Sequence, residues 1–153
     1  MSRCECRGPP SCRTDNGRVV YGGDGIRPDV VLPEPQPRPL WLARVHEQDL
    51  PLRWVADYLH RTPDLPDLER LAEWPVLRDT GVADFRTFAA RQGVEIPNDA
   101  GAAAQLQGVL VATVAMARWG RPGFYRIAAL LDPAVEAAAD AFDHAALILG
   151  RKP

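Results

Sequence analysis

Nucleophilic side chains are scarce in this chain of 153 residues. Its only serines are Ser2 and Ser11, its single lysine is Lys152, and its three cysteines all lie within the first twelve residues. A hydroxyl or thiol nucleophile needs a neighbouring base or a depressed pKa, and both depend on burial that chain ends rarely provide. The sequence therefore predicts no catalytic residue in this chain.

Long hydrophobic runs and an excess of one charge are missing as well. The 18 basic and 20 acidic residues leave a net charge of −2, which gives no sign of a nucleic-acid partner. The longest apolar run, residues 108–117, is about half of what a bilayer requires, so we expect a buried helix and no membrane span. Residues 1–17 lack the apolar region of a secretory signal, so the chain expressed as it stands is expected in the cytoplasm.

Residues 1–13 show no hydrophobic periodicity and contain Cys4, Cys6 and Cys12. A structural zinc site usually presents two pairs of ligands, each pair spaced by two to four residues. Here Cys4 and Cys6 have one residue between them, and no second pair follows. We therefore expect a disordered or non-native leader without a metal or cofactor, with a disulfide and a zinc site as the weaker alternatives.

Residues 14–32 read as a β-hairpin. The runs Arg18–Tyr21 and Asp29–Leu32 are β-branched and aromatic, and Gly22, Gly23 and Gly25 between them permit a turn with positive φ. A phosphate-binding loop is not favoured, because no helix is predicted for more than ten residues after the glycines. Residues 33–39 carry proline at every second position, which predicts an extended spacer between two domains.

Helical patterns fill residues 40–150. Helices are predicted over 40–49, 52–61, 84–93, 99–119, 120–131 and 133–149, with at most a turn or two within 62–75. Asp84 is expected to cap the third helix, and the longest helix is expected to be the central element. The predicted core positions include Leu52, Val55, Ala56, Leu59, Phe85, Phe88, Ala89, Leu106, Val109, Leu110, Val114 and Ala117. The fold class is therefore mainly α, with a short N-terminal β-hairpin before a small helical bundle.

Histidines and tryptophans offer few candidates for chemistry. His46, His60 and His144 stand singly on separate predicted helices, without a carboxylate or cysteine at ligand spacing, so a surface or interface role is favoured over a metal site. The four tryptophans all lie in the helical part. Packing between helices is their simpler use, and lining a groove is the alternative.

Two segments carry a family resemblance. The string Gly17-Arg-Val-Val-Tyr-Gly-Gly-Asp-Gly-Ile-Arg-Pro-Asp-Val30 resembles the segment that closes the catalytic core of carboxyl-terminal processing peptidases, the tail-specific serine protease family. Asp24 replaces the glycine usually found at that place. The Asp132-Pro-Ala-Val135 start of an alanine-rich helix is similar, more weakly, to the closing helix of many family members. The resemblance implies a serine-type peptidase, which is a hydrolase that carries out proteolysis. Members of the family are usually located in the cell envelope or periplasm.

The resembled family uses a serine activated by a lysine, and both precede the glycine string in its members. Ser2, Ser11 and Lys152 do not fit that pair, so we expect a C-terminal fragment of such a peptidase that is inactive alone. Because the closing helices of the family pack on the protease core, the bundle is expected to expose apolar surface and to bind a peptidase core or itself. The alternative is a stand-alone helical protein-binding module. A hydrolase using Cys12 comes third, because nothing positions a histidine beside it.

Overall fold

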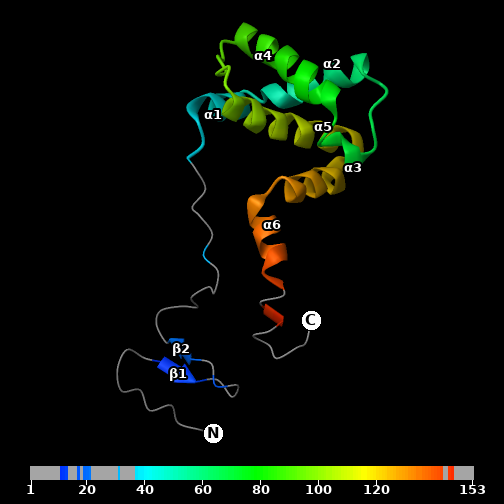
Figure 1. The fold of residues 1–153 in the computed structure, drawn as a ribbon. Helices are drawn as coiled ribbons and strands as arrows, with labels where there is room; N and C mark the ends of the chain where they lie inside the picture. The colour runs from blue at the N-terminus through cyan, green and yellow to red at the C-terminus, as the bar shows by residue number, and fades with distance from the viewer. Residues whose placement is uncertain are drawn as a thin grey trace. The chain divides into compact units, whose positions relative to one another are not determined.

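The computed structural model describes residues 11–13, 17, 19–21, 31, 37–142 and 145–146. The chain divides into two compact units, Met1–Pro33 and Glu34–Pro153, and each is considered by itself. The fold is mainly helical, as the sequence predicts (Figure 1). The division falls at the start of the predicted proline-rich spacer.

The first unit contains two short strands, β1 (Ser11–Arg13) and β2 (Val19–Tyr21), which pair antiparallel. This pairing differs from the prediction, which joined β2 to Asp29–Leu32 and placed β1 in a leader without regular structure. Of Asp29–Leu32 only Val31 is described, and it lies outside any strand. A shorter connection explains the difference: Gly17 adopts φ 77°, and Arg13 Nη1 donates a hydrogen bond to its carbonyl at 2.9 Å.

The second unit begins with α1 (Leu40–Glu47) and α2 (Leu50–Arg61). Pro51 falls between the helices predicted over 40–49 and 52–61. It instead lies in the first turn of α2, where a missing N–H is tolerated. The break falls at Asp49, whose φ of 52° is left-handed. Leu52 and Ala56, both predicted core residues, are exposed, Leu52 to 56%. The large aromatic side chains of Trp54 and Tyr58 fill the core from α2 instead. The buried residues of α2 are Leu50, Pro51, Trp54, Val55 and Tyr58.

Three elements follow: α3 (Leu68–Leu71), the π-helix η1 (Val76–Gly81) and α4 (Val82–Arg91). Because η1 runs directly into α4, Asp84 lies inside the helix and does not cap it, so that prediction was wrong. Gly93 ends the helix at φ 79°, as predicted, and the Val94 N–H bonds the Ala89 carbonyl at 3.0 Å. The Arg86 guanidinium then holds the following loop by donating to the Pro97 carbonyl at 2.9 Å.

The longest helix, α5 (Ala100–Leu130), is two arms joined by a bend. Asp99 caps its start by accepting from the Ala102 N–H at 2.8 Å. Gly120 interrupts it at φ 68° and ψ −160°, and Pro122 follows in the first turn of the second arm. A Cβ on Gly108 would lie 3.7 Å from Leu131 Cδ1, so the second arm turns back along the first (Figure 1). The predicted break after Trp119 is therefore confirmed.

The hydrophobic core lies where α5 meets α2, α3, η1 and α4. Its fully buried centre includes Phe85, Leu106, Leu110, Val114 and Ile127. Ala117, predicted as a core residue, is exposed, since Val111 and Ala115 occupy the inward face of α5 instead. Among the described residues no Asp, Glu, Lys, Arg or other strongly polar residue is buried in the core, and its polar atoms come from the aromatic side chains of Trp54 and Tyr58.

By length and composition α5 is also apolar enough to cross a membrane, with a mean hydropathy of 1.5 in its most apolar window. This is weak evidence, because the core helix of a soluble protein meets the same criterion. In the structure, Leu106, Leu110 and Val114 pack in the interior of the bundle. The helix predicted as buried is thus seen in the core, and the absence of a membrane span stays a prediction.

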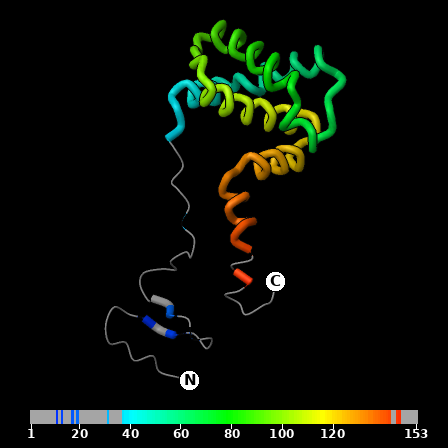
Figure 2. The backbone as a smooth tube through the Cα atoms, in the orientation of Figure 1, coloured from blue at the N-terminus to red at the C-terminus, as the bar shows by residue number. Residues whose placement is uncertain are grey.

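The last described helix is α6 (Pro133–Asp140). Asp132 caps it by accepting from the Ala134 N–H at 2.8 Å, and Pro133 occupies its first turn, as predicted. None of its residues is buried. Figure 2 shows α6 as a separate length of helix after the end of α5.

Candidate functional site

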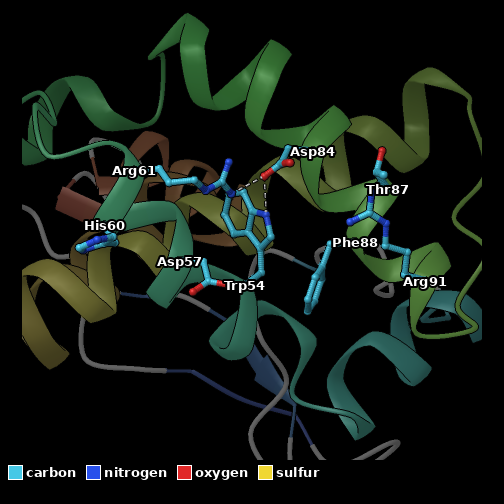
Figure 3. A pocket seen from close by; sticks show the side chains of 8 residues that line it. All are labelled: Trp54, Asp57, His60, Arg61, Asp84, Thr87, Phe88 and Arg91. Atoms are coloured by element: carbon cyan, nitrogen blue, oxygen red, sulfur yellow. Dashed lines mark hydrogen bonds and ion pairs between the residues drawn. The ribbon is translucent and has the colours of Figure 1, made fainter.

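A pocket of about 490 Å³ lies between α2 and α4. Figure 3 shows the side chains that line it, with Arg61 and Trp54 meeting Asp84. This volume is within the range of small-molecule sites. The lining residues are Trp54, Asp57, His60, Arg61, Asp84, Thr87, Phe88 and Arg91.

Asp84 is the best-fixed polar group of this pocket. Its Oδ2 accepts a hydrogen bond from Trp54 Nε1 and another from Arg61 Nη2, each at 2.9 Å (Figure 3). The indole is itself held by aromatic packing, because it stacks on Tyr58 at 4.4 Å and meets Phe85 edge-on at 5.6 Å. A buried aromatic cluster therefore sets the position of a carboxylate at the surface.

Electrostatics keep Asp84 ionised. Partial burial opposes its charge, but the hydrogen bonds from Arg61 and Trp54, with the nearby charge of Arg91, outweigh that effect and lower the pKa of this carboxyl. A depressed pKa makes Asp84 a poor proton donor or acceptor near neutral pH. Its role in this arrangement is to orient Arg61 and Trp54.

The pocket has the chemistry of binding and lacks that of an activated nucleophile. Its hydroxyl group belongs to Thr87, which donates to the Ala83 carbonyl one helical turn earlier at 3.1 Å. No histidine or carboxylate hydrogen bond to that hydroxyl is found among the described residues. The lining contains two arginines and two aspartates beside the aromatic side chains of Trp54 and Phe88. The pocket therefore favours a ligand with both polar and apolar parts.

A second, larger cavity of about 830 Å³ is an apolar groove. We use the name α5 groove for it, because most of its lining residues belong to α5: Ala104, Gly108 and Ala112 lie in the first arm and Phe124 lies beyond the bend, with Leu131 just after the helix. Arg38 and His46 are also among its lining residues, and no carboxylate is. A smaller hollow of about 300 Å³ shares His46, Thr113 and Phe124 with it.

The two described histidines lie in different cavities. His46 borders the α5 groove, whereas His60 borders the pocket between α2 and α4. Burial and the nearby Arg38 charge lower the pKa of His46, and Asp49 only partly opposes them. The structure therefore does not bring these two side chains together, and no group of three His, Cys, Asp or Glu residues that could hold a metal ion is found in the part of the chain that is described.

The other sequence candidates are placed only in part. Ser11 is exposed on β1. Cys12 lies in β1, but its side chain is outside the described residues, as are Ser2, Cys4, Cys6, His144 and Lys152. Sequence reasoning missed the contact of Trp54 and Arg61 with Asp84. The available signal was the spacing of Trp54 and Arg61, which are seven positions apart and therefore share one face of α2.

Comparisons with protein-family models, with curated proteins and with solved structures found no match to this chain. The likeness to carboxyl-terminal processing peptidases therefore stays a prediction that depends on the two quoted segments.

Proposed function

We propose that this chain is a C-terminal part of a serine-type carboxyl-terminal processing peptidase, and that its helical unit is a non-catalytic protein-binding domain. The glycine string Gly17–Val30 supports the family. The binding role depends on one observation: α6 has no buried residue, and its Val135 is 46% exposed. Phe142, just beyond the end of α6, is 73% exposed. Exposed apolar side chains of this kind form a surface that a partner protein would cover.

Catalysis by the serine and lysine pair of that family is not expected from this chain. Ser11 is exposed in a short strand. A lysine acts as the base of such a pair only with a depressed pKa, which requires burial beside the serine, and Lys152 lies outside the described residues. The pocket between α2 and α4 offers no substitute nucleophile, since the Thr87 hydroxyl donates its hydrogen bond to the Ala83 carbonyl oxygen of the same helix.

An activity test follows from this. The purified chain is expected to show no turnover of unstructured peptides with apolar carboxyl ends and no labelling by a serine-directed phosphonate. A Ser11→Ala variant is the matched control, because any labelling of the native chain that this variant loses would locate a reactive hydroxyl. Specific labelling at Ser11 or Ser2 would contradict the proposal.

The second candidate function is a stand-alone helical protein-binding module. It is favoured by the apolar core of the unit Glu34–Pro153, whose buried residues lie between Val45 and Ile127. The nucleotide sequence upstream of codon 1 separates the two candidates. A reading frame encoding a serine and lysine core directly before this chain supports the peptidase origin, whereas an unrelated gene there supports the module.

A further inference from the structure

We propose that the α5 groove is the docking site for α6 of a second copy of this chain. The proposal is independent of the peptidase resemblance, because it depends only on contacts and exposure within the helical unit. It commits to one occupant, and it makes the protein a dimer with two equivalent contacts.

The two surfaces are complementary in polarity. The α5 groove is lined mostly by Ala, Gly, Val, Phe and Leu side chains. Helix α6 presents Val135, Ala138 and Ala139 at positions i, i+3 and i+4, which share one face. All three of these residues are exposed. Small residues such as Gly108 in the groove allow the backbone of an incoming helix to approach closely.

The charges are complementary too. Helix α6 contains Glu136 and Asp140, follows Asp132, and has no basic residue within its bounds. Arg38 is among the residues that line the groove, and no carboxylate is, although Asp49 lines the adjoining smaller hollow. The acidic side chains of the incoming helix would therefore enter a site whose own lining carries the positive charge of Arg38, which favours the contact.

The local chain geometry keeps α6 out of its own groove. Only Leu131 and Asp132 connect α5 to α6, and Pro133 restricts Asp132 to extended backbone, where it is found at φ −93° and ψ 110°. Leu131 lines the groove, but no residue of α6 does. Each chain thus holds both an open groove and an exposed helix, and a two-fold dimer covers both surfaces at once.

A cross-linking experiment tests this directly. In a background with Cys4→Ser, Cys6→Ser and Cys12→Ser, one chain carries Ala104→Cys in the groove and a second carries Val135→Cys on α6. A short bis-maleimide is expected to give a covalent heterodimer in the mixture. The matched control is Ala90→Cys, an exposed alanine of α4, which is expected to give none with the same partner.

Two cross-linking outcomes would overturn the proposal, and so would one result on the native chain. One is a heterodimer yield no greater for Ala104→Cys than for Ala90→Cys. The other is a chain carrying both Ala104→Cys and Val135→Cys that links only internally, which would mean that α6 closes on its own groove. Native chain that sediments as a monomer at every concentration would contradict it as well.

Substitutions without new cysteines give a second readout. Ala104→Glu and Val135→Glu are each expected to weaken dimerisation by at least about tenfold, since each places a charge in an apolar contact. Ala90→Glu is expected to leave it unchanged. A mixture of the Ala104→Glu and Val135→Glu chains retains one native contact and is expected to dimerise more strongly than either chain alone. Equal weakening by all three variants, or no gain in the mixture, would count against the reciprocal arrangement.

Discussion

At the residue scale, Asp84 shows how a buried cluster determines a surface group. The Trp54 indole packs against Tyr58 and Phe85, and its Nε1 donates a hydrogen bond to the Asp84 carboxylate. A part-buried donor that loses its acceptor costs more than the hydrogen bond itself contributes. The Arg61 contact is different, since it is an ion pair between side chains that are 58% and 40% exposed and is weakened by solvent.

Asp84→Ala is therefore expected to lower the free energy of unfolding by about 1–2 kcal/mol, because Trp54 Nε1 is left without an acceptor. Asp84→Asn keeps a carbonyl acceptor and removes only the charge, so its loss is expected to be smaller. Asp79→Asn is the matched control, since Asp79 pairs with Arg78 in solvent. Urea unfolding of the three variants measures the differences, and equal losses for the alanine and asparagine variants at position 84 would show that the indole bond contributes nothing.

The same carboxyl predicts a dependence on pH. Its pKa is lower in the folded chain than the value of about 3.9 expected when unfolded, so its contribution is fully present above about pH 4. That contribution is lost as the pH falls through the folded pKa. The stability difference between the native chain and Asp84→Asn is therefore expected to shrink below about pH 4 and to stay constant from there to neutrality.

At the element scale, the sequence predicted the helices better than their faces. Caps and breakers were read correctly at Gly93, Gly120 and Asp132, because each acts through local backbone chemistry. The inward face of α2 was right only in part: Val55 is buried as predicted, whereas Leu52 and Ala56 are exposed. The packing of the aromatic side chains of α2 against α4 decides the rotation of the helix, and it is not local. The π-helix η1 left no recognisable pattern either, so Asp84 was taken for a cap.

The bend in α5 provides a test at this scale. Gly120 lies at φ 68° and ψ −160°, a region that side-chain-bearing residues avoid, so Gly120→Ala is expected to cost about 1–3 kcal/mol. Gly108→Ala is the control in the same helix: its new Cβ would make an ordinary 3.7 Å contact with Leu131, and removing a helical glycine is expected to stabilise by about 0.5–1 kcal/mol. Thermal unfolding of both variants checks the prediction, which fails if the two substitutions have the same sign.

At the scale of the whole molecule, the helical unit combines a closed core with an uncovered helix. The core around Phe85 and Leu106 draws buried residues from α1 to α5 and from η1, whereas α6 adds no buried residue. The sequence predicted a bundle with exposed apolar surface, but not where that surface lies. It could not predict the cavities, because both form between segments far apart in the chain: α2 with α4, and α1 with the two arms of α5.

Two chemically identical caps distinguish the cooperative core from the rest of the molecule. Asp99 and Asp132 each accept a hydrogen bond at 2.8 Å from a backbone N–H of the first turn of their helix. Asp99→Ala weakens α5, which contains much of the core, so it is expected to lower the global stability by about 1 kcal/mol. Asp132→Ala weakens only α6, so under conditions where the chain is monomeric it is expected to reduce helical circular dichroism while leaving the main unfolding transition in place. If Asp132→Ala shifted that transition as much as Asp99→Ala, α6 would belong to the cooperative core, and its exposed face would be covered in solution by its own chain.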